Sequence, residues 1–198
     1  MIHLLTVCTG NICRSPFAER MLQEEFDALR PGLFSVRSAG TESLVGHEME
    51  TESAELLSTF NGSSDGFASR QLTPQLLTSI DMVLTMTVDH RDAVIKMSPR
   101  MLKRTYTLIE FARILKEIRR AKNSDVVTGH SEENVNRRWT ALPVLAALYR
   151  STAKPSPELQ DVVDPFRRSP EIHQQMVEEI MPAIEEIVAF ERWYGQQP

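Results

Sequence analysis

The sequence reads Cys-Thr-Gly-Asn-Ile-Cys-Arg-Ser-Pro from Cys8 to Pro16. Residues 2–7, directly before it, form a short apolar run rich in strand-forming side chains, which predicts a buried strand. Apolar residues recur near helical spacing over residues 17–29, which predicts an amphipathic helix with Ser15 as its N-cap. The stretch therefore joins the carboxyl end of a strand to the amino end of a helix, where free backbone N–H groups and the helix dipole attract an anion.

The residue types in this stretch suit nucleophilic attack on a tetrahedral oxyanion. Backbone amides and a helix N-terminus facing Cys8 would favour its thiolate form, which is the nucleophile. The five residues between Cys8 and Arg14 can wrap the anion, and Arg14 can hold two equatorial oxygens bidentately. Gly10 supplies backbone freedom for a tight wrap, while Asn11 tolerates a left-handed conformation and can hydrogen-bond the loop. The Ser15 hydroxyl can donate to the sulfur and ease its departure from an intermediate.

Residues 7–16 resemble the signature loop of low molecular weight protein tyrosine phosphatases. Three further segments resemble the family in the expected order, at residues 38–41, 81–91 and 161–167. The resemblance implies a phosphotyrosine phosphatase that uses no metal or other cofactor and works through a phosphocysteine intermediate. The catalytic residues that it implies are Cys8, Arg14 and Asp164. The phosphate-binding residues that it implies are Thr9, Gly10, Asn11, Ile12, Cys13, Arg14 and Ser15.

The resemblance assigns the general acid to Asp164, because the late segment of the family carries that group. As an alternative, Asp164 is only a turn residue before Pro165. Asp161 is the rival carboxylate, and we expect it to be a solvated or loop-capping charge. Leu44 and Phe166 are expected to line the substrate cleft, with Phe166 as an aromatic wall.

Cys13 allows two interpretations. It can be a redox partner that protects Cys8 by forming a disulfide, or it can be a buried side chain that only packs. The chain has two cysteines and no Cys/His cluster around them, so the sequence does not predict a zinc site.

The sequence departs from the family in two places that bear on the site. Phe67 stands where relatives often have a His that braces the phosphate loop. Leu44 and Val45 stand where many relatives have an aromatic substrate wall. Ile12 resembles the phosphotyrosine type, whereas Thr at this position goes with phosphoarginine. Residues 164–169 resemble bacterial members that act on tyrosine kinases of exopolysaccharide synthesis.

Composition and charge exclude several classes of protein. The 41% hydrophobic and 25% charged fractions are those of an ordinary globular protein, and no apolar run approaches the length of a membrane span. A net charge of −5 argues against a general nucleic-acid binder. Two cysteines, one needed as a thiolate, and no recognisable secretory signal predict a cytoplasmic protein. The expected partner is a phosphotyrosine protein, with neither nucleic acid binding nor membrane insertion.

Strand and helix patterns alternate along the chain, which predicts a small doubly wound α/β fold with a four-stranded parallel sheet. The predicted strands are residues 2–7, 33–38, 81–86 and 104–107, and the predicted helices between them are residues 17–29, 49–60, 74–79 and 89–97. We expect one domain over residues 1–198, with a helical insertion at about 108–159. Pro143 could kink or divide the second helix of the insertion, and residues 151–157 are expected to form a loop. The insertion leaves two options open, a monomer or a homodimer formed through it.

Two other functions remain possible on this sequence. The fold also serves arsenate reductases, and a version coupled to a small thiol would need no further cysteine. A phosphoprotein-binding module without catalysis is the second, although the retention of Cys8, Arg14, Ser15 and Asp164 together argues against it.

Overall fold

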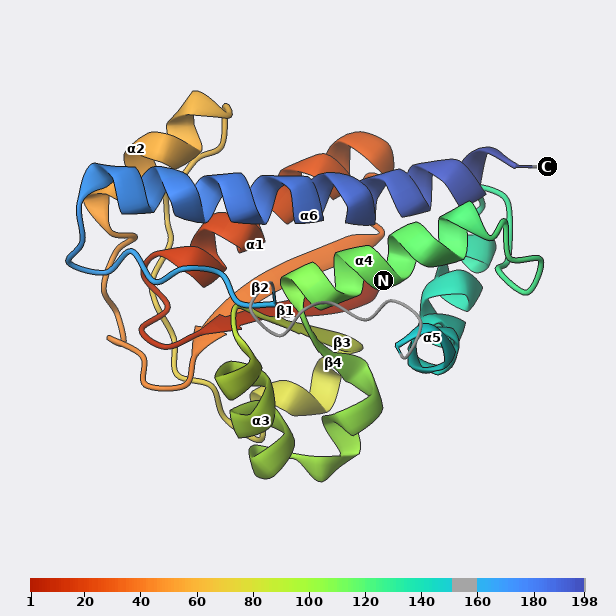
Figure 1. The fold of residues 1–198 in the computed structure, drawn as a ribbon, viewed down its shortest axis with the longest axis horizontal. Coiled ribbons are helices and arrows are strands. Elements are labelled where there is room, and N and C mark those ends of the chain that lie inside the picture. The colour runs from red at the N-terminus through yellow and green to blue at the C-terminus, as the bar shows by residue number, and fades with distance from the viewer. Residues whose placement is uncertain (151–159, 198) are drawn as a thin grey trace.

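The computed structural model describes residues 1–150 and 160–197, and within them four parallel strands form one sheet in the order β2-β1-β3-β4. The strands are β1 (Ile2–Cys8), β2 (Phe34–Gly40), β3 (Met82–Thr85) and β4 (Thr105–Thr107). Every pair of neighbouring strands is parallel, as predicted. Figure 1 shows the sheet between two layers of helices, which confirms the doubly wound fold.

One face of the sheet is covered by the longer helices and the other by shorter ones. The first layer consists of α1 (Arg14–Leu29), α4 (Leu108–Arg120), α5 (Glu132–Tyr149) and α6 (Pro170–Gln196). The second consists of α3 (Val88–Met97) and the 3-10 helices η1 (Leu76–Ser79) and η2 (Pro99–Arg104). Helix α2 (Thr51–Thr59) lies beside the start of α6 (Figure 1). The loops that follow the strands lie together at one end of the sheet, where a parallel α/β fold places its binding site.

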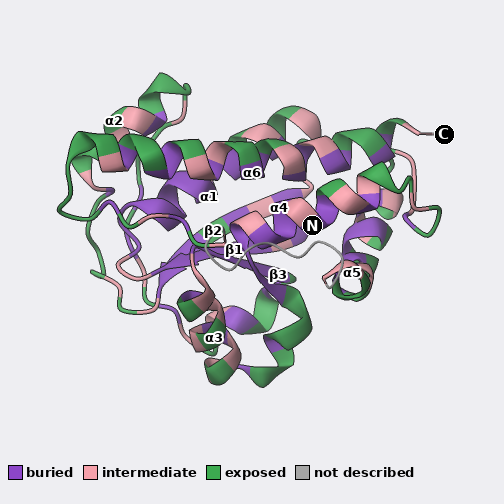
Figure 2. Cartoon of the chain, in the orientation of Figure 1, coloured by how far each residue is buried: buried purple, intermediate pink, exposed green. Residues whose placement is uncertain are grey.

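Side chains of β1 alternate between two hydrophobic clusters, one on each face of the sheet. Leu4 belongs to the larger cluster under α1, α4 and α6, while Leu5 and Val7 belong to the smaller one against α3. All three are fully buried, and Figure 2 shows the sheet as the most buried part of the chain. Burial on both faces explains why this strand is almost continuously apolar in the sequence.

Residues 108–150 of the expected insertion consist largely of the two helices α4 and α5. Ser131 caps α5, because its hydroxyl accepts a hydrogen bond from the Asn134 N–H. Pro143 does not divide this helix, which runs without interruption through it. Arg138 holds α5 to α6 by a buried ion pair with Glu191, 2.6 Å between Nη2 and Oε1. The predicted loop at residues 151–157 lies outside the described residues.

The prediction of a Ser15 N-cap is wrong. Helix α1 begins at Arg14, with Cys13 in the capping position and no capping side chain. Ser15 therefore lies within the first turn, where its hydroxyl faces Cys8 instead of the helix backbone. No helix among the described residues is both long enough and apolar enough to span a membrane.

Candidate active site

The phosphate loop, residues 8–14, connects the end of β1 to the start of α1. Its carbonyl oxygens accept hydrogen bonds from the backbone of the segment that follows β2. The donor-to-acceptor pairs are Thr41 to Cys8 (2.9 Å), Glu42 to Thr9 (3.0 Å), Leu44 to Gly10 (3.1 Å) and Glu50 to Ile12 (2.9 Å). These four bonds tie the loop to the segment after β2 through its carbonyl groups.

Asn11 fixes the turn of this loop. Its φ of 55° is left-handed, whereas Gly10 has no positive φ and is not required by backbone geometry. The freedom expected of Gly10 is therefore not used for a positive φ, and the left-handed conformation that Asn11 is expected to tolerate is observed. The buried Asn11 side chain donates to Ser15 Oγ (2.9 Å) and Ser38 Oγ (2.7 Å) and accepts from the Arg70 N–H (2.8 Å). Three tethers of this kind hold the loop in a single conformation.

Gly40 at the end of β2 permits the close approach of the loop. A Cβ atom at Gly40 would lie 2.3 Å from the carbonyl oxygen of Thr9, which no side chain can tolerate. The contact with the phosphate loop explains why position 40 requires Gly.

The Cys8 thiol lies at the base of the loop and is free and buried. Its Sγ is 3.0 Å from Ser15 Oγ. Ser15 already accepts a hydrogen bond from Asn11, so its own O–H is available to the sulfur. A hydroxyl in this position stabilises a thiolate, both as nucleophile and as leaving group.

Arg14 and Asp164 form an ion pair, 2.8 Å between Nη2 and Oδ2. The guanidinium is buried while the carboxylate is half exposed, so Asp164 faces the opening of the site. Nη1 of Arg14 also donates to the Val162 carbonyl at 3.4 Å. The structure thus brings together the three residues that the sequence assigned to catalysis, two from the loop and one from a segment 150 residues later.

Asp161, the rival carboxylate, points elsewhere. Its Oδ1 accepts a hydrogen bond of 2.8 Å from the Val88 N–H at the start of α3. This contact agrees with the expected loop-capping charge, and Asp161 makes no contact with Arg14 in the described residues.

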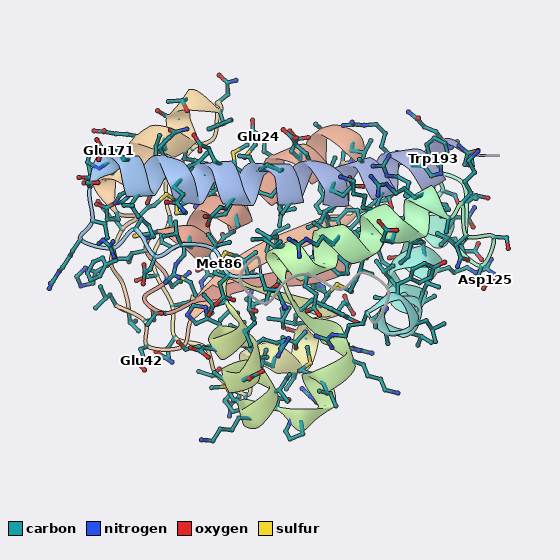
Figure 3. All side chains as sticks on the ribbon, viewed as in Figure 1. Glu24, Glu42, Met86, Asp125, Glu171 and Trp193 are labelled. Carbon is teal, nitrogen blue, oxygen red and sulfur yellow. The ribbon has the colours of Figure 1, made fainter. Side chains whose placement is uncertain are left out.

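A cleft of about 270 Å³ opens above Cys8. Its lining contains the predicted Leu44 and Phe166 together with Cys8, Thr9, Gly10, Ile12, Cys13, Arg14 and Asp164. The sequence did not predict Glu42 and Arg167, which also line the cleft. The Arg167 guanidinium lies 5.0 Å from the centre of the Phe166 ring, and Figure 3 shows Glu42 at the end of the molecule where the loops gather.

Cys13 is the second free thiol and is also buried. Burial raises its pKa to about 12, so the thiol is protonated at neutral pH. A protonated thiol is a slow partner in disulfide formation, and both interpretations of Cys13 remain predictions.

His90 is a residue of the site that the sequence did not single out. Its Nε2 lies 2.9 Å from Thr9 Oγ1, and its Nδ1 lies 2.8 Å from Thr87 Oγ1, the N-cap of α3. Burial, and after it the charge of Arg14, lowers the pKa of His90 to about 4, so the ring is neutral. His90 braces the phosphate loop from α3, whereas Phe67 packs under Arg20. The capping spacing from Thr87 to His90 was the one local signal for this contact.

A family model described as low molecular weight phosphotyrosine protein phosphatase matches residues 3–127. The chain belongs to this family. The match includes the phosphate loop, the four strands and α4, and it stops before α5 and the acid loop.

Individual relatives agree with the family match. The low molecular weight protein-tyrosine-phosphatase Etp of Escherichia coli (strain K12) is 36% identical over 102 residues, which are 52% of this chain and 66% of Etp. This chain thus spans slightly less than two thirds of the length of that relative. The YwlE arginine phosphatase from Geobacillus stearothermophilus has the same fold, with a TM-score of 0.67, 22% identity and coverage of 96% of this chain and 92% of the other. Vibrio vulnificus Wzb in complex with benzylphosphonate gives a TM-score of 0.65, with 21% identity over 95% of this chain and 97% of Wzb.

Proposed function

We propose that this chain is a protein tyrosine phosphatase that hydrolyses phosphotyrosine through a phosphocysteine intermediate. The observation that carries the proposal is the cleft above Cys8. A thiol, a buried guanidinium and a half-exposed carboxylate converge there on the loop between β1 and α1. Family membership and the tyrosine phosphatase names of relatives such as Etp support it.

In the first step the Cys8 thiolate attacks phosphorus in line. The S–P bond forms while the bond from phosphorus to the tyrosine oxygen breaks, and the Asp164 carboxyl gives its proton to the departing phenolate. Arg14 and the loop N–H groups hold the equatorial oxygens as charge develops on them.

The ion pair between Arg14 and Asp164 prepares this step. Without substrate, Arg14 is paired with the Asp164 carboxylate at 2.8 Å. A bound phosphate group replaces Asp164 as the partner of the guanidinium, so the Asp164 side chain is released towards the leaving oxygen.

In the second step water hydrolyses the phosphocysteine. Asp164, now a carboxylate, removes a proton from water as it attacks phosphorus, the P–S bond breaks, and inorganic phosphate is released. The Ser15 hydroxyl stabilises the departing thiolate through its 3.0 Å contact with Sγ.

The lining of the cleft supports an aryl phosphate substrate. Phe166 and Leu44 give the opening apolar walls against which a tyrosine ring can pack, and Ile12 stands where Thr would favour phosphoarginine. The resemblance of residues 164–169 supports a tyrosine kinase of exopolysaccharide synthesis as the protein substrate.

The need for a thiolate at Cys8 supports the cytoplasm as the location, because thiols stay reduced there. We infer one domain over residues 1–198 with a helical insertion at about 108–159, whose second helix α5 lies beyond the family match, which ends at residue 127. Both a monomer and a homodimer through the insertion remain candidates. Val144 and Leu148 on α5 are 67% and 69% exposed, which is the observation in favour of the dimer.

A parallel assay of the purified protein tests the proposal. It compares an aryl phosphate, a phosphoarginine peptide, and arsenate with a small thiol, each with Cys8→Ser as the control and with a chelator present. We expect turnover of the aryl phosphate that resists the chelator and requires Cys8. Turnover of arsenate alone would establish a reductase, and turnover of phosphoarginine alone would establish a different substrate class.

A further inference from the structure

The segment that carries Asp164 is held by neighbours on both sides. The Val162 N–H donates to the Met86 carbonyl at 2.8 Å, just after β3, and the Val162 side chain is buried (Met86 is labelled in Figure 3). Asp161 caps α3 through the Val88 N–H. These contacts fix the two positions that start the acid loop, residues 161–164.

The third contact comes from α6, which lies on the opposite side of the loop from α3. Glu179 Oε2 accepts a hydrogen bond of 2.7 Å from the Val163 N–H. Its other oxygen accepts from Gln175 Nε2 at 2.8 Å, which orients the carboxylate along the helix. A charged acceptor on a backbone N–H is stronger than a neutral one, and this N–H belongs to the residue directly before Asp164.

We propose that Glu179 is a positioning residue for the general acid Asp164. The proposal rests on the proposed phosphatase function. The Val163 N–H lies in the peptide plane that ends at the Val163 Cα, so the hydrogen bond that Glu179 accepts holds the residue directly before Asp164, whose side chain must reach the leaving oxygen. The carboxylate of Asp164 is half exposed and has Arg14 as its one ion-pair partner among the described residues. Its position in the substrate complex, where Arg14 binds phosphate, therefore depends on the backbone.

Different elements of the fold hold the phosphate loop and the acid loop. The phosphate loop, with Cys8, is held by β1, α1, the segment after β2 and His90, whereas the hydrogen bonds of Glu179 among the described residues go to Val163 and Gln175. The link to Arg14 is one long contact of 3.4 Å, from its Nη1 to the Val162 carbonyl. Loss of Glu179 should therefore weaken the proton transfers of Asp164 much more than phosphate binding or the nucleophile. A general defect in folding would affect all of them together.

The test compares Glu179→Ala and Glu179→Gln on p-nitrophenyl phosphate, which has a good leaving group, and phenyl phosphate, which has a poor one. A positioned general acid contributes roughly 10²–10⁴-fold, and it contributes mainly for poor leaving groups. For Glu179→Ala we expect kcat/KM, which reports the step that releases the phenol, to fall about tenfold on phenyl phosphate and less than about twofold on p-nitrophenyl phosphate. The inhibition constant of inorganic phosphate should change much less than kcat/KM on phenyl phosphate.

Glu179→Gln should recover most of the activity on phenyl phosphate, because its amide oxygen still accepts from the Val163 N–H. Glu178→Ala is the matched control, because it removes the same charge from the neighbouring position of α6. The Glu178 carboxylate accepts a hydrogen bond from Gln174, not from the acid loop. Equal losses on both substrates, or no loss on either, would overturn the inference. The wild-type enzyme and Cys8→Ser are measured beside these variants. Equal activity of the wild-type enzyme and Cys8→Ser on p-nitrophenyl phosphate would instead overturn the proposed phosphatase function.

Discussion

Replacement of Asn11 by Ala removes the residue that holds the phosphate loop in shape. Asn11 combines a left-handed φ of 55° with three side-chain hydrogen bonds to Ser15, Ser38 and Arg70. Ala in the left-handed region costs roughly 1 kcal/mol more than Asn or Gly. The three lost hydrogen bonds, one of which leaves the Arg70 N–H unpaired, add about 1 kcal/mol each. The free energy of unfolding should therefore fall by roughly 3–5 kcal/mol.

A loss of this size is measurable by thermal denaturation. For a chain of this length 1 kcal/mol corresponds to about 2–4 °C, so the Tm should fall by roughly 6–20 °C. The value of kcat/KM should fall on the order of 10²-fold, and by the same factor for good and poor leaving groups, because the loop and not the acid is disturbed.

Asn11→Gly is the control that separates backbone from side chain. It restores the left-handed conformation but none of the hydrogen bonds, so it should be more stable than Asn11→Ala by roughly 1 kcal/mol. The reasoning is refuted by an Asn11→Ala variant that keeps the wild-type Tm and kcat/KM, since the tethers would then hold nothing.

The remaining predictions concern the acid, the second thiol and the buried histidine. Asp164→Asn should steepen the dependence of the rate on the pKa of the leaving group, measured with a series of aryl phosphates. Asp161→Asn should not, because its amide oxygen can still accept the hydrogen bond from the Val88 N–H, and the opposite result would exchange the roles of the two residues. Because the pKa of Cys13 is raised to about 12, the disulfide between Cys8 and Cys13 that peroxide induces should form steadily faster from pH 7 to pH 10, as measured by mass spectrometry. In Cys13→Ala the peroxide-treated enzyme should no longer regain activity in thiols, and inactivation that is no faster in this variant than in the wild type would mean that Cys13 only packs. His90 is neutral in the folded protein down to about pH 4 but is protonated in the unfolded chain below about 6.5, so the free energy of unfolding should fall as the pH falls from 6.5 towards 4. His90→Gln should lose less Tm over that range than the wild type, and a Tm that depends on pH equally in both proteins would contradict the buried neutral ring.

The first strand, the phosphate loop and the following helix could be predicted because their determinants are local. An apolar run, a short loop and an apolar helical stripe lie within 30 residues of one another. The late acid Asp164 came from the resemblance, since no local pattern distinguishes it from Asp161. What separates the two is their contacts, with Arg14 in one case and Val88 in the other.

The contacts that brace the site were not predictable, because they join distant parts of the chain. His90 and Thr9 are 81 residues apart in sequence, and the carboxylate of Glu179 meets the acid loop through the backbone of Val163. Neither pairing has a periodicity that a sequence pattern could show. The left-handed conformation of Asn11 could be expected from its residue type, whereas its hydrogen bonds to Ser38 and Arg70 join distant segments and could not.

Trapping the covalent intermediate tests the central claim most directly. The enzyme is mixed with an aryl phosphate, quenched in acid within milliseconds, digested and examined by mass spectrometry. We predict one phosphoryl group on the peptide that contains Cys8, absent from Cys8→Ala under the same conditions, because Ala offers no nucleophilic atom. Turnover without any phosphorylated Cys8 peptide, or with the phosphoryl group on another residue, would contradict the account.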